Sequence, residues 1–131
     1  MKLNPDCIRD ILFVVEDLSK PNSIITSDQL FKTESLSKYS EEEVLYHLNQ
    51  LQLSGYIIVP TKNRWIDGTY LLNDLSPSGH EFISNVRKDT NWNKVKSISK
   101  EVGTETLSSL KSIAENVISS TIQSLMGLNK Y

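Results

Sequence analysis

Apolar positions recur at helical spacing over most of the chain. The first such stretch begins at Asn4 and Pro5, a strong helix start because Asn accepts hydrogen bonds from unpaired amides and Pro has no amide hydrogen to lose. Residues 20–22, Lys-Pro-Asn, predict its end. The apolar face of this helix consists of Ile8, Ile11, Leu12, Val15 and Leu18.

Residues 24–39 carry a weaker pattern. Ile24 and Ile25 favour a short strand, whereas Thr26 or Ser27 favours the N-cap of a short helix directly after it. We expect both elements.

Residues 39–57 carry the strongest helix signal. Ser40 followed by Glu43 is the capping-box pattern, in which the hydroxyl accepts from the amide of residue 43 and the carboxylate reaches back. Residues 41–43 are all Glu and lie in the first turn of this helix. The positive end of the helix dipole favours negative charge there. Gly55 is placed to end the helix in a Schellman motif. The buried stripe is predicted to hold Val44, Leu45, Leu48 and Leu51.

Two strands, 56–60 and 69–72, are predicted to follow and to form a hairpin with Asp67 and Gly68 as its turn signal. Ser76 and Pro77 then repeat the pattern of a helix start.

Two more helices are predicted towards the C-terminus. Residues 89–91 break or recap the chain before a helix that Gly103 ends. Thr104 is the predicted cap of the last helix, from about Glu105 to Met126.

This order of elements is that of a winged helix. We predict a mainly α fold with a small β-hairpin: a winged helix-turn-helix-like domain over residues 1–90, followed by a helical C-terminal extension over residues 91–131. One spacing departs from common helix-turn-helix proteins. Leu30 and Val44 lie fourteen positions apart, against about eleven in those proteins, which predicts a longer turn or an irregular second helix.

Four segments together carry a family resemblance. They are Tyr39–Leu48 (YSEEEVLYHL), Leu51–Ile57, Leu75–Phe82 (LSPSGHEF) and Trp92–Val95. The chain resembles a family of small proteins that is common in bacterial genomes and their prophages and is catalogued as a domain of unknown function. The resemblance implies a winged-helix-like fold and no particular activity.

Composition narrows the class of protein. A chain of 131 residues with 38% apolar and 23% charged residues is typical of one ordinary globular domain. Cys7 is the single cysteine, so no internal disulfide is possible. His47 and His80 are the only histidines of the chain, so we expect no metal site. The N-terminus lacks the apolar core of a signal peptide, and no segment approaches the roughly 18 apolar residues of a membrane span. These features predict a cytoplasmic protein without membrane contact.

The sequence contains no arrangement typical of an enzyme. It has no Gly-rich phosphate loop and no nucleophile with a base at a known spacing. His80 beside Glu81 follows a helix start, where a capping or surface role is the simpler interpretation than general acid-base catalysis. We therefore expect no enzymatic activity and no cofactor.

Charge makes DNA binding difficult through the helix that begins at Ser40 and ends at Gly55. With Val44, Leu48 and Leu51 inward, its predicted outward face holds Glu42, Glu43, Tyr46, His47, Asn49 and Gln50. Asn and Gln can pair with adenine, but strong binders neutralise about six to ten phosphates. Residues 1–75 carry seven basic and eleven acidic groups, a net charge of −4, whereas residues 76–131 carry seven basic and five acidic groups, a net charge of +2.

Basic residues are concentrated elsewhere. The candidate nucleic-acid contacts are Lys62 and Arg64 in the hairpin, and Arg87, Lys88, Lys94, Lys96 and Lys100 in the segment RKDTNWNKVKSISK. Because the apolar positions of that segment also recur at helical intervals, an amphipathic helix with a solvated basic face is the alternative interpretation.

The last predicted helix has a wide apolar surface. Its candidate oligomer-interface residues are Leu107, Leu110, Val117, Ile118, Ile122 and Leu125. The alternative is that this surface packs back on the first helix of the same chain. Two functional hypotheses follow: a prophage-associated module that binds double-stranded DNA, or an interaction module that pairs with itself or another protein and has lost DNA binding.

Overall fold

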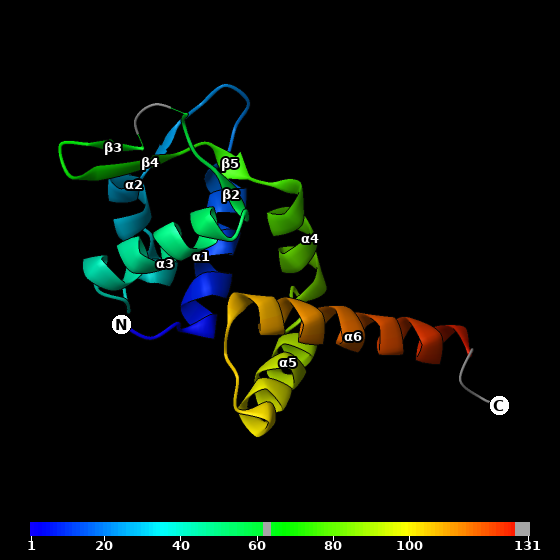
Figure 1. Ribbon diagram of the computed structural model, residues 1–131. Coiled ribbons are helices and arrows are strands. Elements are labelled where there is room, and N and C mark those ends of the chain that lie inside the picture. Colours follow the sequence, from blue (N-terminus) through cyan, green and yellow to red (C-terminus); the bar gives the residue numbers. More distant parts are fainter. Residues whose placement is uncertain (62–63, 128–131) are drawn as a thin grey trace. The chain divides into compact units, whose positions relative to one another are not determined.

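The chain folds mainly into helices. The computed structural model describes residues 1–61 and 64–127. Within them, short strands accompany longer helices, which confirms the predicted mainly helical fold with a small antiparallel sheet and C-terminal helices. Backbone contacts divide the chain into two compact units, Met1–Glu81 and the residues from Phe82 onward. Figure 1 labels most elements of both units.

Two helices form most of the core of the first unit. α1 spans Pro5–Leu18, and α3 spans Glu41–Leu53. The two helices contact each other. Asn4 caps α1 as predicted, since its side-chain oxygen accepts from the amides of Asp6 and Cys7. Their fully or almost fully buried side chains are Cys7, Ile8, Ile11, Leu12, Val14, Val15, Val44, His47, Leu48 and Leu51.

The segment between these helices contains both predicted elements. β1 spans Ile25–Thr26, and α2 spans Ser27–Phe31 with a capping box between Thr26 and Gln29. A 3-10 turn, η1, follows at Glu34–Leu36. The short α2 and this added turn account for the long Leu30-to-Val44 spacing.

The predicted capping box at the start of α3 is only half present, whereas the predicted Schellman motif at its end is complete. The hydroxyl of Ser40 accepts from the amide of Glu43 at 3.1 Å, as expected. The carboxylate of Glu43 does not complete the capping box; it accepts from the side-chain amide of Asn4 at 3.3 Å. At the other end, Gly55 has φ +78° and the Schellman bond from Tyr56 N to Leu51 O is present at 2.8 Å.

The predicted strand pairing is wrong in one respect. β3 (Trp65–Ile66) and β4 (Thr69–Leu72) form the hairpin, while β2 (Ile57–Ile58) pairs with β5 (Asp74–Leu75). Asp67 and Gly68 both have positive φ, as a two-residue type I′ turn requires, and such a turn pairs the residues immediately beside it. β1 adds to the other edge of β4, giving the antiparallel order β1-β4-β3.

The start of α4 (Pro77–Asn85) lies close to the end of α3. The hydroxyl of Ser76 accepts from the amide of Gly79, which confirms the predicted helix start. A Cβ at Gly79 would overlap the carbonyl oxygen of Tyr56, so this close approach requires glycine.

The second unit contains α5 (Asp89–Val102) and α6 (Leu107–Met126), which pack on each other. Gly103 ends α5 with φ +83°, as predicted. The predicted cap of α6 is two residues too early, because Thr106 rather than Thr104 forms a capping box with Ser109. The carbonyl of Thr104 instead accepts from the hydroxyl of Ser99 at 2.6 Å.

Candidate interaction surfaces

The N-terminal tip of α3 is negatively charged. Glu41 and Glu42 are exposed, and α3 contains no Lys or Arg. Their position in the first turn is favourable for the helix because the macrodipole is positive there. The tip therefore presents carboxylates to its surroundings without a compensating cation on the same helix.

His47 was predicted to point outward, and this prediction is wrong: its side chain is fully buried. The main-chain amide of Asn4 donates to Nε2 of His47 at 2.8 Å, and Nδ1 lies 2.7 Å from the carbonyl oxygen of Glu43. Because Nε2 must accept, the proton resides on Nδ1, which donates to that carbonyl. The signal was present in the sequence, since position 47 lies on the helix surface beside 44, 48 and 51.

Burial sets the protonation state of His47. It lowers the pKa of the imidazole, and the backbone hydrogen bond and negative charge of Glu43 oppose this shift without reversing it. Glu43, also predicted to point outward, is half-buried and bonded to Asn4. Neither side chain is therefore presented to a partner.

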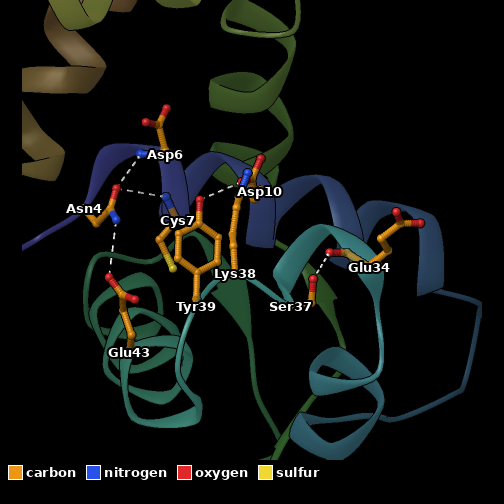
Figure 2. A network of polar contacts seen from close by, with 9 residues as sticks. All are labelled: Asn4, Asp6, Cys7, Asp10, Glu34, Ser37, Lys38, Tyr39 and Glu43. Carbon is orange, nitrogen blue, oxygen red and sulfur yellow. Dashed lines mark hydrogen bonds and ion pairs between the residues drawn. The ribbon is translucent and has the colours of Figure 1, made fainter.

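A second polar contact joins Tyr39, two residues before α3, to α1 (Figure 2). The hydroxyl of Tyr39 donates to Oδ2 of Asp10 at 2.7 Å, and the same oxygen lies 3.2 Å from Nζ of Lys38. Burial first, and then the hydrogen bond to Asp10, raises the pKa of Tyr39. Cys7 is buried nearby with a pKa raised to about 12, mainly by burial. These contacts fix the start of α3 on α1.

Among the described residues of the hairpin, one cation and two apolar side chains are exposed. Arg64 is exposed, and so are Trp65 and Ile66, at 44% and 49%. The Trp65 ring meets Tyr70 edge-on, with the ring centroids 5.0 Å apart. Lys62, the other predicted contact in this hairpin, lies outside the described residues.

The basic residues around α5 do not share one face. Arg87, Lys88, Lys94 and Lys100 are exposed, and Lys96 is half-buried with Nζ 5.8 Å from the centre of the Trp92 ring. Lys94 and Lys100 are six residues apart, so at about 100° per residue they point in directions about 120° apart. Lys94 also borders a groove between α5 and α6.

The predicted interface residues of α6 fall into two groups. Leu107, Leu110 and Val117 are buried within the chain, so they hold α6 in its own fold. Ile118 is half-buried, whereas Ile122 and Leu125 are exposed. Met126 is also exposed; it belongs to the same apolar surface, although it was not among the predicted interface residues.

In residues 1–61 and 64–127, no helix is both long and apolar enough to cross a membrane. Nor do three or more His, Cys, Asp or Glu side chains there converge as metal ligands do.

Comparison with known proteins identifies the family of the chain. The family model described as "Hypothetical protein (DUF2513)" matches residues 2–105, a range that includes α1 through α5 and ends before α6. A protein of Haemophilus influenzae described as uncharacterized is 29% identical over 120 residues, which cover 91% of this chain and 97% of that protein. No solved structure gives a significant match. The chain therefore belongs to the DUF2513 family.

Proposed function

We propose that the first unit is a winged-helix-like module that binds protein rather than DNA. Its partner surface consists of the acidic tip of α3 and the apolar side chains of the β3–β4 hairpin. The partner is a protein surface that combines Lys or Arg with apolar groups.

The arrangement of elements supports the winged-helix part of this proposal. α1, β1, α2 and α3 precede the β3–β4 hairpin, and β1 pairs with β4 at the far edge of the sheet. A winged helix has this order, with α3 in the position of the reading helix. The likeness concerns the fold, and function has to be argued from the side chains.

One observation carries the choice of protein over DNA: Glu41 and Glu42 are exposed at the tip of a helix that has no cation. A DNA-reading helix enters the major groove between two rows of phosphates. Its affinity for DNA depends on Lys and Arg side chains that neutralise phosphates and thereby release the counterions bound to the DNA. Residues 1–81 carry seven basic and twelve acidic side chains, a net formal charge of −5. Carboxylates at the point of entry therefore oppose groove insertion.

The same charges favour a basic partner. Complementary charge speeds the encounter and excludes wrong partners, while buried aromatic side chains supply much of the affinity of an interface. Trp65 and Ile66 provide exposed apolar area on the hairpin. Trp65 is already held by its edge-on contact with Tyr70, so binding costs little side-chain entropy there.

A synthetic amphipathic peptide rich in Lys and Leu tests this proposal. We expect it to bind the full chain at low salt, and the double variant Glu41→Gln, Glu42→Gln to bind about fivefold more weakly, as for two exposed charge pairs. Glu101→Gln, Glu105→Gln removes the same charge from exposed sites outside the first unit and should leave affinity unchanged. No binding, or an equal loss in both double variants, would overturn the proposal.

A second candidate function is DNA binding through the second unit. The residues from Phe82 onward carry seven basic and four acidic side chains, a net charge of +3, and Lys94 and Lys100 are exposed. If this candidate is correct, Lys94→Glu with Lys100→Glu weakens salt-dependent binding to mixed-sequence duplex, whereas Glu41→Gln with Glu42→Gln does not.

A further inference from the structure

An open groove lies between α5 and α6, within the second unit. Its volume is about 310 Å³, at the lower end of the range for sites that bind small molecules. Lys94 and Ile98 line it from one face of α5, on which they lie four residues apart. The residues of α6 that line it run along one face of that helix, from Ile113 to Thr121. The groove is therefore formed by this pair of helices alone.

One part of the groove is apolar. It is lined by Ile98, Ile113 and Val117. Val117 is the most buried of the three, whereas Ile113 is half-buried and Ile98 is 39% exposed. An apolar group placed along Ile98 and Ile113 would remove their exposed surface from water, and the gain is proportional to the area that is covered. This part of the groove suits a hydrocarbon chain.

Polar side chains line the rest of the groove. The hydroxyl of Thr121 donates to the carbonyl oxygen of Val117 at 2.9 Å, so its proton is engaged within α6. The other three are Lys94, Asn116 and Ser120, and no group in residues 1–61 and 64–127 forms a hydrogen bond or ion pair with their side chains. They supply an ammonium, an amide and a hydroxyl donor.

The charge of the groove selects among possible ligands. Lys94 carries the only charge among the described residues that line it. A carboxylate can accept several hydrogen bonds, and those from an ammonium group are stronger than those between neutral groups. A cationic ligand would instead bring like charges together at Lys94. The groove therefore favours a ligand that combines an apolar body with one negative charge.

We propose that the α5–α6 groove binds a small aliphatic carboxylate. The hydrocarbon chain lies along Ile98 and Ile113, and the carboxylate accepts from Nζ of Lys94 and from the side chain of Asn116 or Ser120. The methylene groups of Lys94 cover part of the hydrocarbon chain while the ammonium group stays at the rim. This site belongs to the second unit and is independent of the protein-binding role proposed above, which uses residues of the first unit.

Isothermal titration of the full chain with decanoate and with decylammonium chloride tests the preference for an anion. We expect one decanoate to bind per chain with a dissociation constant of about 0.3 mM. Decylammonium should bind at least about tenfold more weakly. The net formal charge of the chain is −2, so non-specific adsorption would favour the cation instead. Decylammonium binding as tight as that of decanoate, or no decanoate binding, would overturn the proposal.

Lys94→Met tests the cation of the site, because it removes the charge and keeps most of the side-chain length. We expect decanoate to bind this variant about fivefold more weakly. Lys100→Met is the matched control: Lys100 is exposed on the same helix and does not line the groove, so its loss should leave decanoate binding unchanged. An equal loss in both variants would contradict a site at Lys94.

A steric block tests the position of the ligand. Ser120→Trp fills the groove and should abolish decanoate binding, whereas Ser119→Trp, at a neighbouring exposed position outside the groove, should bind as the wild type does. Both serines are exposed, so the circular dichroism spectra of both variants should match that of the wild type. Decanoate binding that survives in Ser120→Trp would place the ligand elsewhere and overturn the proposal. None of these results changes the peptide-binding test of the proposed function, so the two failures are distinguishable.

Discussion

The main-chain amide of Asn4 donates a hydrogen bond to Nε2 of His47 over 2.8 Å, across 43 positions of sequence. This bond joins the residue that caps α1 to the second turn of α3. It exists only while the imidazole is neutral, since a protonated Nε2 is a donor and would face another donor. The contact between the two helices is therefore sensitive to pH.

We expect the free energy of unfolding to fall as the pH is lowered from 7.5 to 5.5. Burial lowers the pKa of His47 in the folded chain below its unfolded value of about 6.5. The stabilisation is fully present above about pH 6.5 and is lost as the pH falls through the folded-state pKa. Urea titrations should show a loss about 1 kcal/mol larger in the wild type than in His47→Gln.

His80 provides the control for this pH effect. It is the other histidine and its side chain is exposed, so His80→Gln removes a histidine without disturbing the contact between α1 and α3. A wild type and a His47→Gln variant with parallel pH profiles would show that His47 does not titrate on unfolding in this range.

Tyr39→Phe should destabilise the chain by about 1 kcal/mol. The substitution removes the 2.7 Å hydrogen bond to Asp10 and leaves the ring in place. The carboxylate of Asp10 keeps Lys38 as a neighbour at 3.2 Å, which limits the loss. Chemical denaturation measures the difference. An unchanged unfolding midpoint and slope would mean that water replaces the phenol without cost.

Cys7 should be unreactive towards a disulfide reagent in the native state at pH 8. Its side chain is fully buried, and burial raises the thiol pKa to about 12, so almost no thiolate is present. We expect full and rapid labelling only after the chain is unfolded in guanidinium chloride. Stoichiometric labelling of the native protein within seconds would contradict the buried position of Cys7.

Gly79→Ala should cost more stability than Gly55→Ala. An added Cβ at position 79 would overlap the carbonyl oxygen of Tyr56, a backbone atom directly before β2 that moves only with the main chain, and we expect a loss of about 3 kcal/mol. At Gly55 a Cβ meets nothing within 4 Å, and the cost of about 1 to 2 kcal/mol comes from its positive φ. Thermal or urea unfolding gives the order, and a smaller loss at position 79 would contradict the close approach.

Local signals predicted the elements whose stability is local. The Asn4-Pro5 start, the Ser40 cap, the Gly55 Schellman motif and the Gly103 terminus all depend on residues within one or two turns, and the structure contains them. Pairings between residues that are distant in the sequence were harder to predict. The partner of Ile57–Ile58 is Asp74–Leu75, which becomes clear only when the Asp67–Gly68 turn is taken to pair the residues beside it.

The candidate surfaces followed the same division. The exposure of Glu41 and Glu42 could be predicted from the sequence, because charged side chains at a helix start are not expected in an apolar core. The inward position of His47 was missed, although position 47 lies on the helix surface beside 44, 48 and 51. Only its hydrogen-bond partner, Asn4, lies far away in the sequence, at 43 residues. Periodicity marked the apolar surface of α6, but it did not separate the buried Leu110 from the exposed Leu125, which depends on where the chain itself covers the helix.

Fluorescence anisotropy with a labelled mixed-sequence duplex at about 20 mM salt, where phosphate contacts are strongest, tests the central claim most directly. The claim is that the acidic tip of α3 prevents that helix from reading DNA. We expect no binding by the wild-type chain and salt-dependent binding by Glu41→Lys, Glu42→Lys. Wild-type binding that weakens steeply with salt and changes upon substitution of Asn49 or Gln50, the polar residues of α3 able to pair with bases, would contradict it.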